Sequence, residues 1–109
     1  VDHDVLHFDE CKVDMSLRQV TDREYQISQL TGGEYQLLSV LLGNLGKVMS
    51  RDQLLDQMRN REWAPNDRTI DVLIGRLRRK LRDDPATPRI ILTIHGVGYL
   101  LAAKALQAA

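Results

Sequence analysis

The segment N-D-R-T-I-D-V-L-I-G-R-L-R-R-K, residues 66–80, decides the fold of this 109-residue chain. Wound as an α-helix at about 100° per residue, it separates two kinds of side chain. One stripe holds the apolar residues Ile70, Leu73, Ile74, Leu77 and Leu81. The opposite face holds Arg68, Val72, Gly75, Arg76 and Arg79. Such a helix fits the DNA major groove, which offers acceptors to arginine and thymine methyls to small apolar groups.

The composition indicates one folded domain with a modest core, since 43% of residues are apolar and 28% are charged. The longest apolar runs, residues 37–42 and 90–94, are too short to span a membrane. The first residues lack the blocks of a signal peptide. Cys11 is the single cysteine, so an internal disulfide is impossible. This favours a reducing compartment, and we expect a cytoplasmic protein.

The net charge is zero, but the charges are unevenly distributed. Residues 1–36 hold eight acids and three basic residues, whereas residues 67–82 hold six basic residues and two acids. Screening limits the reach of distant charges to about 8–10 Å, so the basic stripe attracts phosphate even on a neutral molecule. The alternative is a solvated helix face without a partner.

Residues 6–30 are expected to form a small antiparallel sheet. Partial alternation predicts strands at Val5–Phe8, Lys12–Leu17 and Tyr25–Leu30, and turn-prone pairs such as Arg18-Gln19 and Thr21-Asp22 separate them.

Three helices follow this sheet. The Thr-x-x-Glu spacing at residues 31–34 predicts a capping box for a first helix at 32–45, which Gly46 ends. Its apolar positions are Tyr35, Leu38, Leu41, Leu42 and Leu45.

A second box at residues 50–53 opens a helix at 51–60, and residues 60–66 form a loop. The third helix is placed at 67–82, because Pro85 disfavours helix at the residue before it.

Residues 90–94 and 99–102 are apolar strands around the glycine-containing turn 95–98, which predicts a β-hairpin at 90–102. Three helices and a hairpin indicate an α+β fold, the winged helix-turn-helix, with the hairpin as the wing. The domain is expected at 6–102, after a linker remnant at 1–5 and before a tail at 103–109.

Four motifs occur in a familiar order: L-T-G-G-E-Y-Q-L-L at 30–38, S-R-D-Q-L-L at 50–55, D-R-T-I-D-V-L-I-G-R-L-R-R-K-L at 67–81 and H-G-V-G-Y at 95–99. Together they resemble the OmpR/PhoB-type effector domain of bacterial response regulators. The resemblance implies a four-stranded N-terminal sheet. It also implies sequence-specific binding to double-stranded promoter DNA, with the third helix in the major groove and the wing in the minor groove.

In the family, two such domains bind direct repeats head-to-tail, and a sensor histidine kinase phosphorylates a preceding receiver domain. No receiver pattern is present in these 109 residues. The acidic start at residues 1–4 therefore predicts an excised effector domain rather than a natural stand-alone relative.

The third helix carries most of the predicted DNA contacts. Arg68 and Thr69 match family positions that contact DNA, and the Thr69 hydroxyl can donate to phosphate or simply cap the first turn. Val72 either meets a thymine methyl or is an ordinary exposed valine. Arg76 and Arg79 are the best candidates for reading bases or holding phosphate.

Three further positions of this helix have other expected roles. Arg78 is expected to touch phosphate or to pair with Asp71 or Asp84, and Asp71 is expected to bridge to an arginine. Gly75 stands where many family members carry a polar residue. It removes one base contact and lets the backbone approach DNA closely.

The wing and the second helix supply the remaining contacts. Thr93 matches a phosphate-contacting position, and His95 stands at the wing tip where many members carry an arginine for the minor groove. Ser50 and Arg51 are placed to reach phosphates at a helix N-terminus, although capping alone explains Ser50.

The loop before the third helix contains Arg61, Glu62 and Trp63. In the family this loop can touch RNA polymerase, so these residues are a candidate anchor for it. The alternative is that Trp63 folds back on the core.

Other functions have weaker support. His3, His7 and Cys11 recur every four residues, but an extended segment would not bring them together, and we predict no metal or other cofactor. No catalytic motif is present, which argues against an enzyme. The main alternative is a winged-helix interaction module whose basic face binds an acidic protein.

Overall fold

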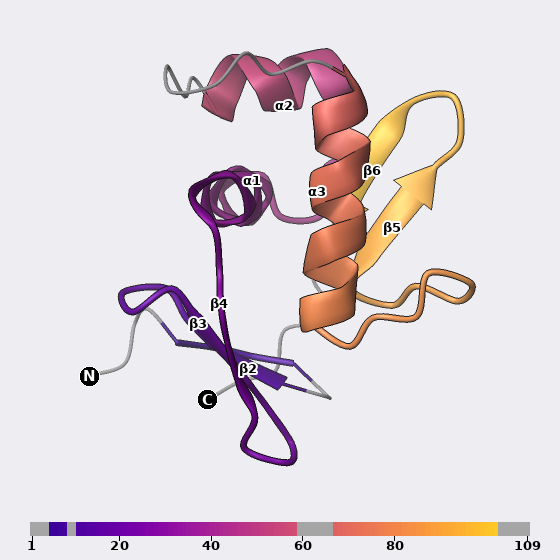
Figure 1. Cartoon of the computed structure of the whole chain (residues 1–109). Coiled ribbons are helices and arrows are strands. Elements are labelled where there is room, and N and C mark those ends of the chain that lie inside the picture. Colours follow the sequence, from indigo (N-terminus) through magenta and orange to yellow (C-terminus); the bar gives the residue numbers. More distant parts are fainter. Residues whose placement is uncertain (1–4, 9–10, 59–66, 103–109) are drawn as a thin grey trace.

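The computed structural model of the chain describes residues 5–8, 11–58 and 67–102. An antiparallel sheet comes first, then three helices, then a hairpin (Figure 1). The elements are β1 (Val5–His7), β2 (Cys11–Asp14), β3 (Gln19–Asp22), β4 (Ile27–Gln29), α1 (Gly32–Gly43), α2 (Arg51–Met58), α3 (Asp67–Lys80), β5 (Ile91–Ile94) and β6 (Gly98–Leu101). The α+β winged-helix fold predicted from the sequence is confirmed.

The N-terminal sheet is a meander with strand order β1-β2-β3-β4, each strand antiparallel to its neighbours. The strand pattern predicted from alternation was wrong at β3, whose residues we had assigned to turns. Val20 of β3 is paired with Val13 of β2, and both side chains are buried. Strand β3 is polar but extended, because it pairs with β2 on one edge and β4 on the other and buries the Val20 side chain on one face.

The turns of the sheet correct two further strand predictions. The strand expected at Lys12–Leu17 ends at Asp14, because the Asp14 carboxylate accepts hydrogen bonds from the backbone N–H of Ser16 and Leu17 at 3.0 and 3.1 Å. Tyr25 was predicted to begin a strand but lies in the next turn at φ 62°. Its ring is exposed, so no burial opposes the turn.

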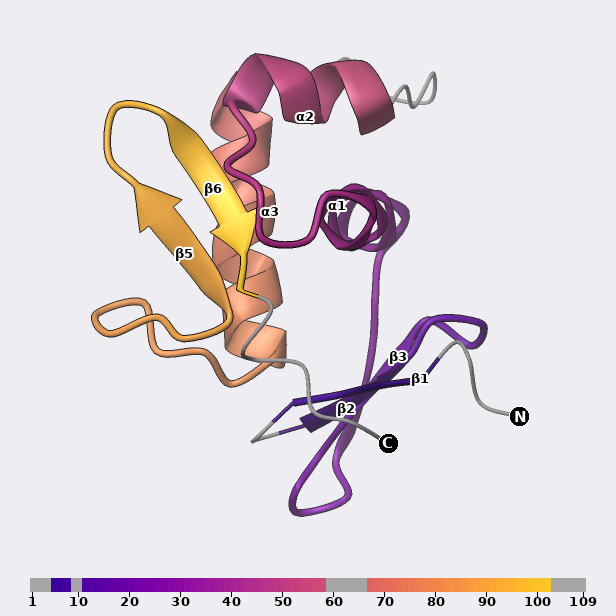
Figure 2. The same ribbon diagram turned by 180° about the vertical axis from the view of Figure 1, so that it is seen from behind.

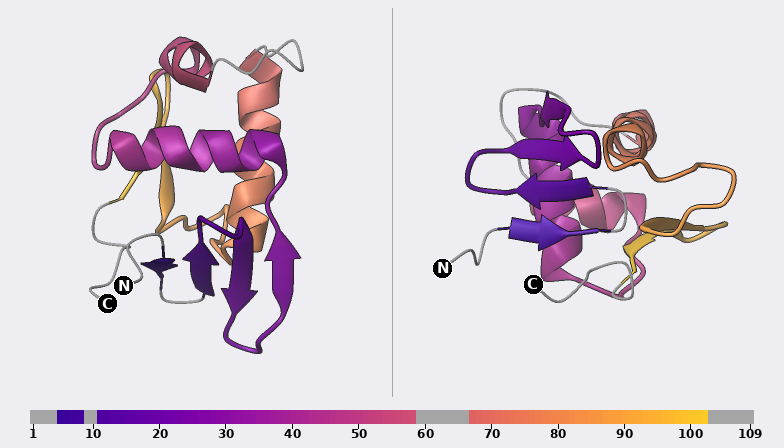
Figure 3. Two further views of the ribbon diagram at one scale, coloured as in Figure 1. Left: turned by 90° about the vertical axis from the view of Figure 1, so that its left-hand side faces the viewer. Right: turned by 90° about the horizontal axis from the view of Figure 1, so that it is seen from below.

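The three helices enclose the core, and the sheet lies along one side of α1 (Figure 3). Helix α1 packs on α3: Leu38 and Leu41, two of the predicted apolar positions, are buried with Ile70, Ile74 and Leu77 in one cluster. Leu37, which the predicted stripe left out, is also fully buried, whereas Leu45 is exposed because α1 ends before it. Packing against α2 as well as α3 widens the apolar face of α1 beyond the predicted stripe.

Local hydrogen bonds set the helix ends. The capping box of α1 is confirmed: the Glu34 backbone N–H donates to Thr31 Oγ1 at 3.3 Å, and the Thr31 N–H donates to Glu34 Oε1 at 2.9 Å. α1 ends at Gly43 rather than at residue 45, and Gly46 takes φ 78° in the turn that follows. Two residues of the predicted helix therefore belong to this turn.

α3 also ends two residues earlier than predicted. Arg82 adopts φ 61°, the Arg82 N–H donates to Arg79 O at 3.3 Å, and the Asp83 N–H donates to Arg78 O at 2.8 Å. This pair of bonds is a Schellman motif, which closes the helix without a glycine. The guanidinium of Arg82 pairs with Asp22 of β3 at 2.7 Å, which ties the end of α3 to the sheet.

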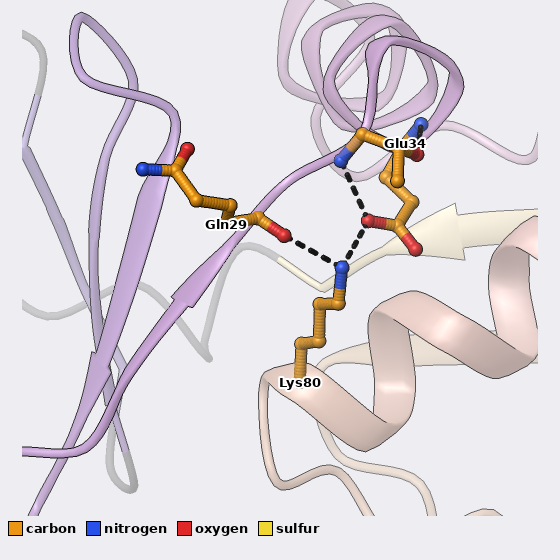
Figure 4. A network of polar contacts seen from close by, with 4 residues as sticks. Gln29, Glu34 and Lys80 are labelled. Carbon is orange, nitrogen blue, oxygen red and sulfur yellow. Dashed lines mark hydrogen bonds and ion pairs between the residues drawn. The ribbon is translucent and has the colours of Figure 1, made fainter.

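A second contact between α3 and the sheet passes through a buried carboxylate. Lys80 Nζ donates to Gln29 O at 2.7 Å and to Glu34 Oε1 at 2.5 Å (Figure 4). The Glu34 side chain is only 1% exposed. The start of α1, the end of β4 and the last turn of α3 thus meet at one ion pair.

The wing is held by backbone contacts and by one buried acid. β5 and β6 form the predicted hairpin, and Met49 forms an additional bridge to Tyr99 of β6 (Figure 2). Asp83 is buried, and its carboxylate accepts the backbone N–H groups of Arg89, Ile90 and Ile91 at 2.7, 3.1 and 2.9 Å. The chain therefore enters β5 in a fixed direction relative to α3.

Candidate nucleic-acid interface

The exposed side of α3 is the centre of the candidate interface. All five apolar stripe residues are buried, whereas Val72, Gly75, Arg76 and Arg79 are exposed on the opposite side. Val72 exposes 50% of its surface. The buried stripe is confirmed, and so is the opposite face at these four positions. The buried stripe fixes the direction in which the exposed side chains point.

Two groups of predicted contacts lie partly or wholly outside the described residues. Arg68 belongs to α3, but its side chain is outside the described part, as are Arg61, Glu62 and Trp63. Thr69 is half-buried in the first turn of α3.

Arg78 points toward the wing. Its Nε and Nη2 atoms donate to Ile91 O at 3.2 and 2.7 Å, and Nη2 also donates to Thr93 Oγ1 at 2.7 Å. The expected pairing with Asp71 or Asp84 was wrong, because packing of β5 against α3 brings backbone and hydroxyl acceptors closer. A hydroxyl that accepts one bond keeps its own proton, so Thr93 retains a donor for phosphate.

Asp71 does bridge to an arginine, as expected, and the partner is Arg51 of α2. Arg51 Nε donates to Asp71 Oδ1 at 2.9 Å, and the Tyr99 hydroxyl donates to the same oxygen at 2.5 Å. The Tyr99 ring lies near two cations, with the guanidinium carbons of Arg51 and Arg78 at 5.5 and 5.8 Å from its centroid. Helix α2, helix α3 and β6 meet in this cluster.

The charges in this cluster are set by their neighbours. Partial burial raises the pKa of Asp71, but the hydrogen bonds from Tyr99 and Arg51 outweigh it and hold the pKa below its ordinary value. Burial, the hydrogen bond to Asp71 and the Asp71 charge raise the pKa of Tyr99. The cluster therefore contains a carboxylate, a neutral phenol and a guanidinium at neutral pH.

Ser50 caps α2 as the sequence predicted. Ser50 Oγ accepts the Gln53 N–H at 3.1 Å, and Gln53 Oε1 accepts the Ser50 N–H at 2.9 Å. The start of α2 therefore presents its positive dipole end beside the start of α3, and Figure 2 shows these two ends close together.

The wing tip is open to solvent. His95, Gly96 and Val97 are exposed, and Gly96 takes φ 79° in the turn between β5 and β6. His95 therefore lies at the tip, where it was predicted.

Within residues 5–8, 11–58 and 67–102, no group of three or more histidine, cysteine, aspartate or glutamate side chains is arranged to hold a metal ion. Cys11 is buried, and its thiol donates to Leu81 O at 3.5 Å. No helix in these segments is long and apolar enough to cross a membrane.

Sequence reasoning missed Tyr99 as a member of this region. It was assigned only to the H-G-V-G-Y motif and to the second apolar strand of the hairpin. A tyrosine in a buried strand needs a partner for its hydroxyl, and that requirement was the available signal.

An exposed cationic helix face, a supporting helix and a hairpin at its side define a winged helix-turn-helix DNA-binding domain. The family model described as "Transcriptional regulatory protein, C terminal" matches residues 22–101. The chain belongs to this family, the OmpR/PhoB-type DNA-binding effector domains of transcriptional response regulators. It is a family of transcription regulators rather than of enzymes.

Similar proteins agree with this assignment. The chain is 56% identical over 101 residues to the transcriptional regulatory protein AruR of Pseudomonas aeruginosa, covering 93% of this chain and 41% of AruR. The chain thus spans about two fifths of the length of such curated relatives.

Among solved structures, the RstA DNA-binding domain of Klebsiella pneumoniae, in complex with the RstA box, matches with a TM-score of 0.70 and 34% identity. That match covers 92% of this chain and 98% of the other. The response regulator DrrB of Thermotoga maritima, an OmpR/PhoB homologue, matches with a TM-score of 0.73 and 33% identity, over 92% of this chain and 45% of DrrB.

Proposed function

We propose that this domain binds promoter DNA by inserting α3 into the major groove and the wing tip into the minor groove. The observation on which the proposal rests is the exposure of two arginine side chains on α3 and their lack of an ion-pair partner among the described residues. Arg76 and Arg79 are exposed, and neither forms an ion pair with a described residue. As far as residues 5–8, 11–58 and 67–102 are concerned, both guanidinium groups are available to base edges or phosphates.

The proposed contacts divide into two kinds. The proposed base contacts come from α3 and are assigned to Arg68, Val72, Gly75, Arg76 and Arg79. The proposed contacts to phosphates and in the minor groove are assigned to Thr69, Ser50, Arg51, Arg78, Thr93 and His95. The fold supports this division, because α2 begins at one side of the α3 face and the wing lies at another (Figures 1 and 2). The complex of the RstA domain with its DNA box supports DNA binding by a domain of this fold.

We also propose that a receiver domain precedes this domain and accepts phosphate from a sensor histidine kinase. We further propose that two such DNA-binding domains bind direct repeats of promoter DNA head-to-tail, in the cytoplasm. The loop at 60–66, with Arg61, Glu62 and Trp63, is the proposed contact for RNA polymerase. The similarity to AruR and DrrB, which extend well beyond this domain, supports the receiver.

Selection of bound duplexes from a random pool, followed by salt titration, tests the DNA-binding proposal. The chain should enrich one sequence, and the logarithm of its affinity should fall linearly with the logarithm of salt concentration, by about 0.9 for each phosphate neutralised. Equal affinity for the enriched and a scrambled duplex would favour the protein-interaction module instead.

Arg76→Ala is expected to weaken binding to the selected duplex by about 1–3 kcal/mol, because it removes an exposed guanidinium from the reading face. A gel-shift titration measures the change. Lys12→Ala is the matched control, since Lys12 is exposed on β2 in the N-terminal sheet. Unchanged affinity of the Arg76 variant, or an equal loss in both variants, would contradict the assignment.

Gly75→Ala should change stability and DNA binding in opposite directions. A Cβ at Gly75 would meet no heavy atom within 4 Å, so alanine should stabilise the exposed helix by up to about 1 kcal/mol. The added methyl would occupy the gap through which the backbone approaches the bases, and affinity for the selected duplex should fall. Thermal unfolding and gel-shift titration measure the two effects. Stronger DNA binding would show that the gap serves no close approach.

A further inference from the structure

The ion pair between Arg51 and Asp71 lies beside the proposed reading face. Asp71 immediately precedes Val72 on α3 and lies one turn before Gly75. The side chains of Arg51 and Asp71 are 37% and 46% exposed. Both charges are therefore within reach of a duplex that approaches α3 and the start of α2.

An anion at this position works against binding to a polyanion. It occupies the Arg51 guanidinium, a cation that would otherwise neutralise a phosphate. The hydrogen bond from Tyr99 does not require the negative charge, because an amide oxygen would still accept it, although in a weaker bond. What the charge of Asp71 adds is its attraction for Arg51.

The carboxylate is also fixed in place. The Tyr99 side chain comes from β6 and the residue is only 6% exposed, so its hydroxyl cannot follow the carboxylate to a new position. Arg51, at the first turn of α2, has a long and partly exposed side chain. Of the two partners, the arginine is the one that can exchange the carboxylate for a phosphate.

We propose that Asp71 competes with DNA phosphates for the guanidinium of Arg51 and thereby limits the sequence-independent affinity of the domain. Asp71 is a positioning residue in this role, since it acts through Arg51 and reads no base. The inference rests on the proposed DNA-binding function. It makes the phosphate contact of Arg51 weaker than that of an unpaired arginine at the same position.

Asp71→Asn in the 109-residue chain tests the proposal, because asparagine keeps an acceptor for Tyr99 and removes the charge that holds Arg51. The probe is a scrambled duplex of fixed length, titrated at several salt concentrations. We expect affinity for it to rise about five- to tenfold at 0.1 M salt, and the salt slope to steepen by about 0.9, as for one additional phosphate contact. The sequence selected from a random pool should stay the same.

Two further variants separate competition for Arg51 from a general gain of positive charge. In the Arg51→Gln background, Asp71→Asn should change the affinity for the scrambled duplex by less than twofold. Asp52→Asn is the matched charge control, since Asp52 is an exposed aspartate next to Arg51 in the sequence. Its effect should be equal with and without the Arg51→Gln change.

Each outcome decides the proposal. An Asp71→Asn effect that persists in the Arg51→Gln background is an effect of net charge and overturns it. A changed selected sequence makes Asp71 a base reader and also overturns it. If Asp71→Asn fails to fold, Arg51→Gln alone decides: a loss of affinity below twofold supports competition, and a larger loss refutes it. Failure of the proposed function is distinct, because the unsubstituted chain would then bind no duplex preferentially.

Discussion

Gly98→Ala is expected to lower the free energy of unfolding by about 3–5 kcal/mol, because the added methyl group would overlap backbone atoms and disrupt backbone hydrogen bonds. A Cβ at Gly98 would lie 2.0 Å from the carbonyl oxygen of Met49 and 2.8 Å from Ser50 Cα. These are backbone atoms, so no side chain can rotate aside to relieve the overlap.

The Gly98 substitution would also separate two paired backbones. The Met49 N–H donates to Tyr99 O at 2.7 Å, and the Tyr99 N–H donates to Met49 O at 2.9 Å. These bonds attach the wing to the segment between α1 and α2, so their loss adds about 1 kcal/mol each to the overlap. Chemical denaturation followed by far-UV circular dichroism measures the loss.

Gly75→Ala is the matched control for Gly98→Ala, because it adds the same methyl group at a position with open space. The two variants should move the unfolding midpoint in opposite directions. A Gly98 variant as stable as the unsubstituted chain would show that β6 can shift away from Met49 at little cost, and that the wing is not held by this close approach.

Lys80→Met should destabilise the domain by about 3 kcal/mol, because it leaves a buried carboxylate without its cation. Glu34 is 1% exposed, and without Lys80 it retains the Thr31 N–H and its place in the capping box (Figure 4). The substitution also removes the hydrogen bond to Gln29 O, which links the last turn of α3 to β4. Chemical denaturation at neutral pH measures the loss.

A second substitution distinguishes a buried charge from lost packing. Glu34→Gln in the Lys80→Met background removes the unpaired charge and keeps an oxygen acceptor for Thr31, so most of the lost stability should return. Lys47→Met is the control, since Lys47 is exposed and its replacement should change stability by less than about 0.5 kcal/mol. Equal stabilities of the Lys80 and Lys47 variants would contradict the role given to the ion pair.

Features that depend on residues close together in the sequence were predicted correctly, and features that depend on distant residues were not. The apolar stripe of α3 and both capping boxes were predicted correctly, because each depends on residues about three or four positions apart. The strand at Gln19–Asp22 was missed, because its polar side chains do not indicate a strand and its conformation depends on pairing with β2 and β4. The exposure of Val72, Arg76 and Arg79 was also predicted correctly, because helical periodicity places these residues opposite the apolar stripe.

The sequence by itself determined a two-faced helix and the order of elements around it, because periodicity and capping are local properties of the chain. Only the tertiary structure decided which cations already have acceptors within the domain. Arg51 pairs with Asp71 across 20 positions, Arg78 with the backbone of Ile91 across 13, and Lys80 with Glu34 across 46. A guanidinium or ammonium group pairs with whichever acceptor packing brings near it, and spacing along the chain does not encode that proximity.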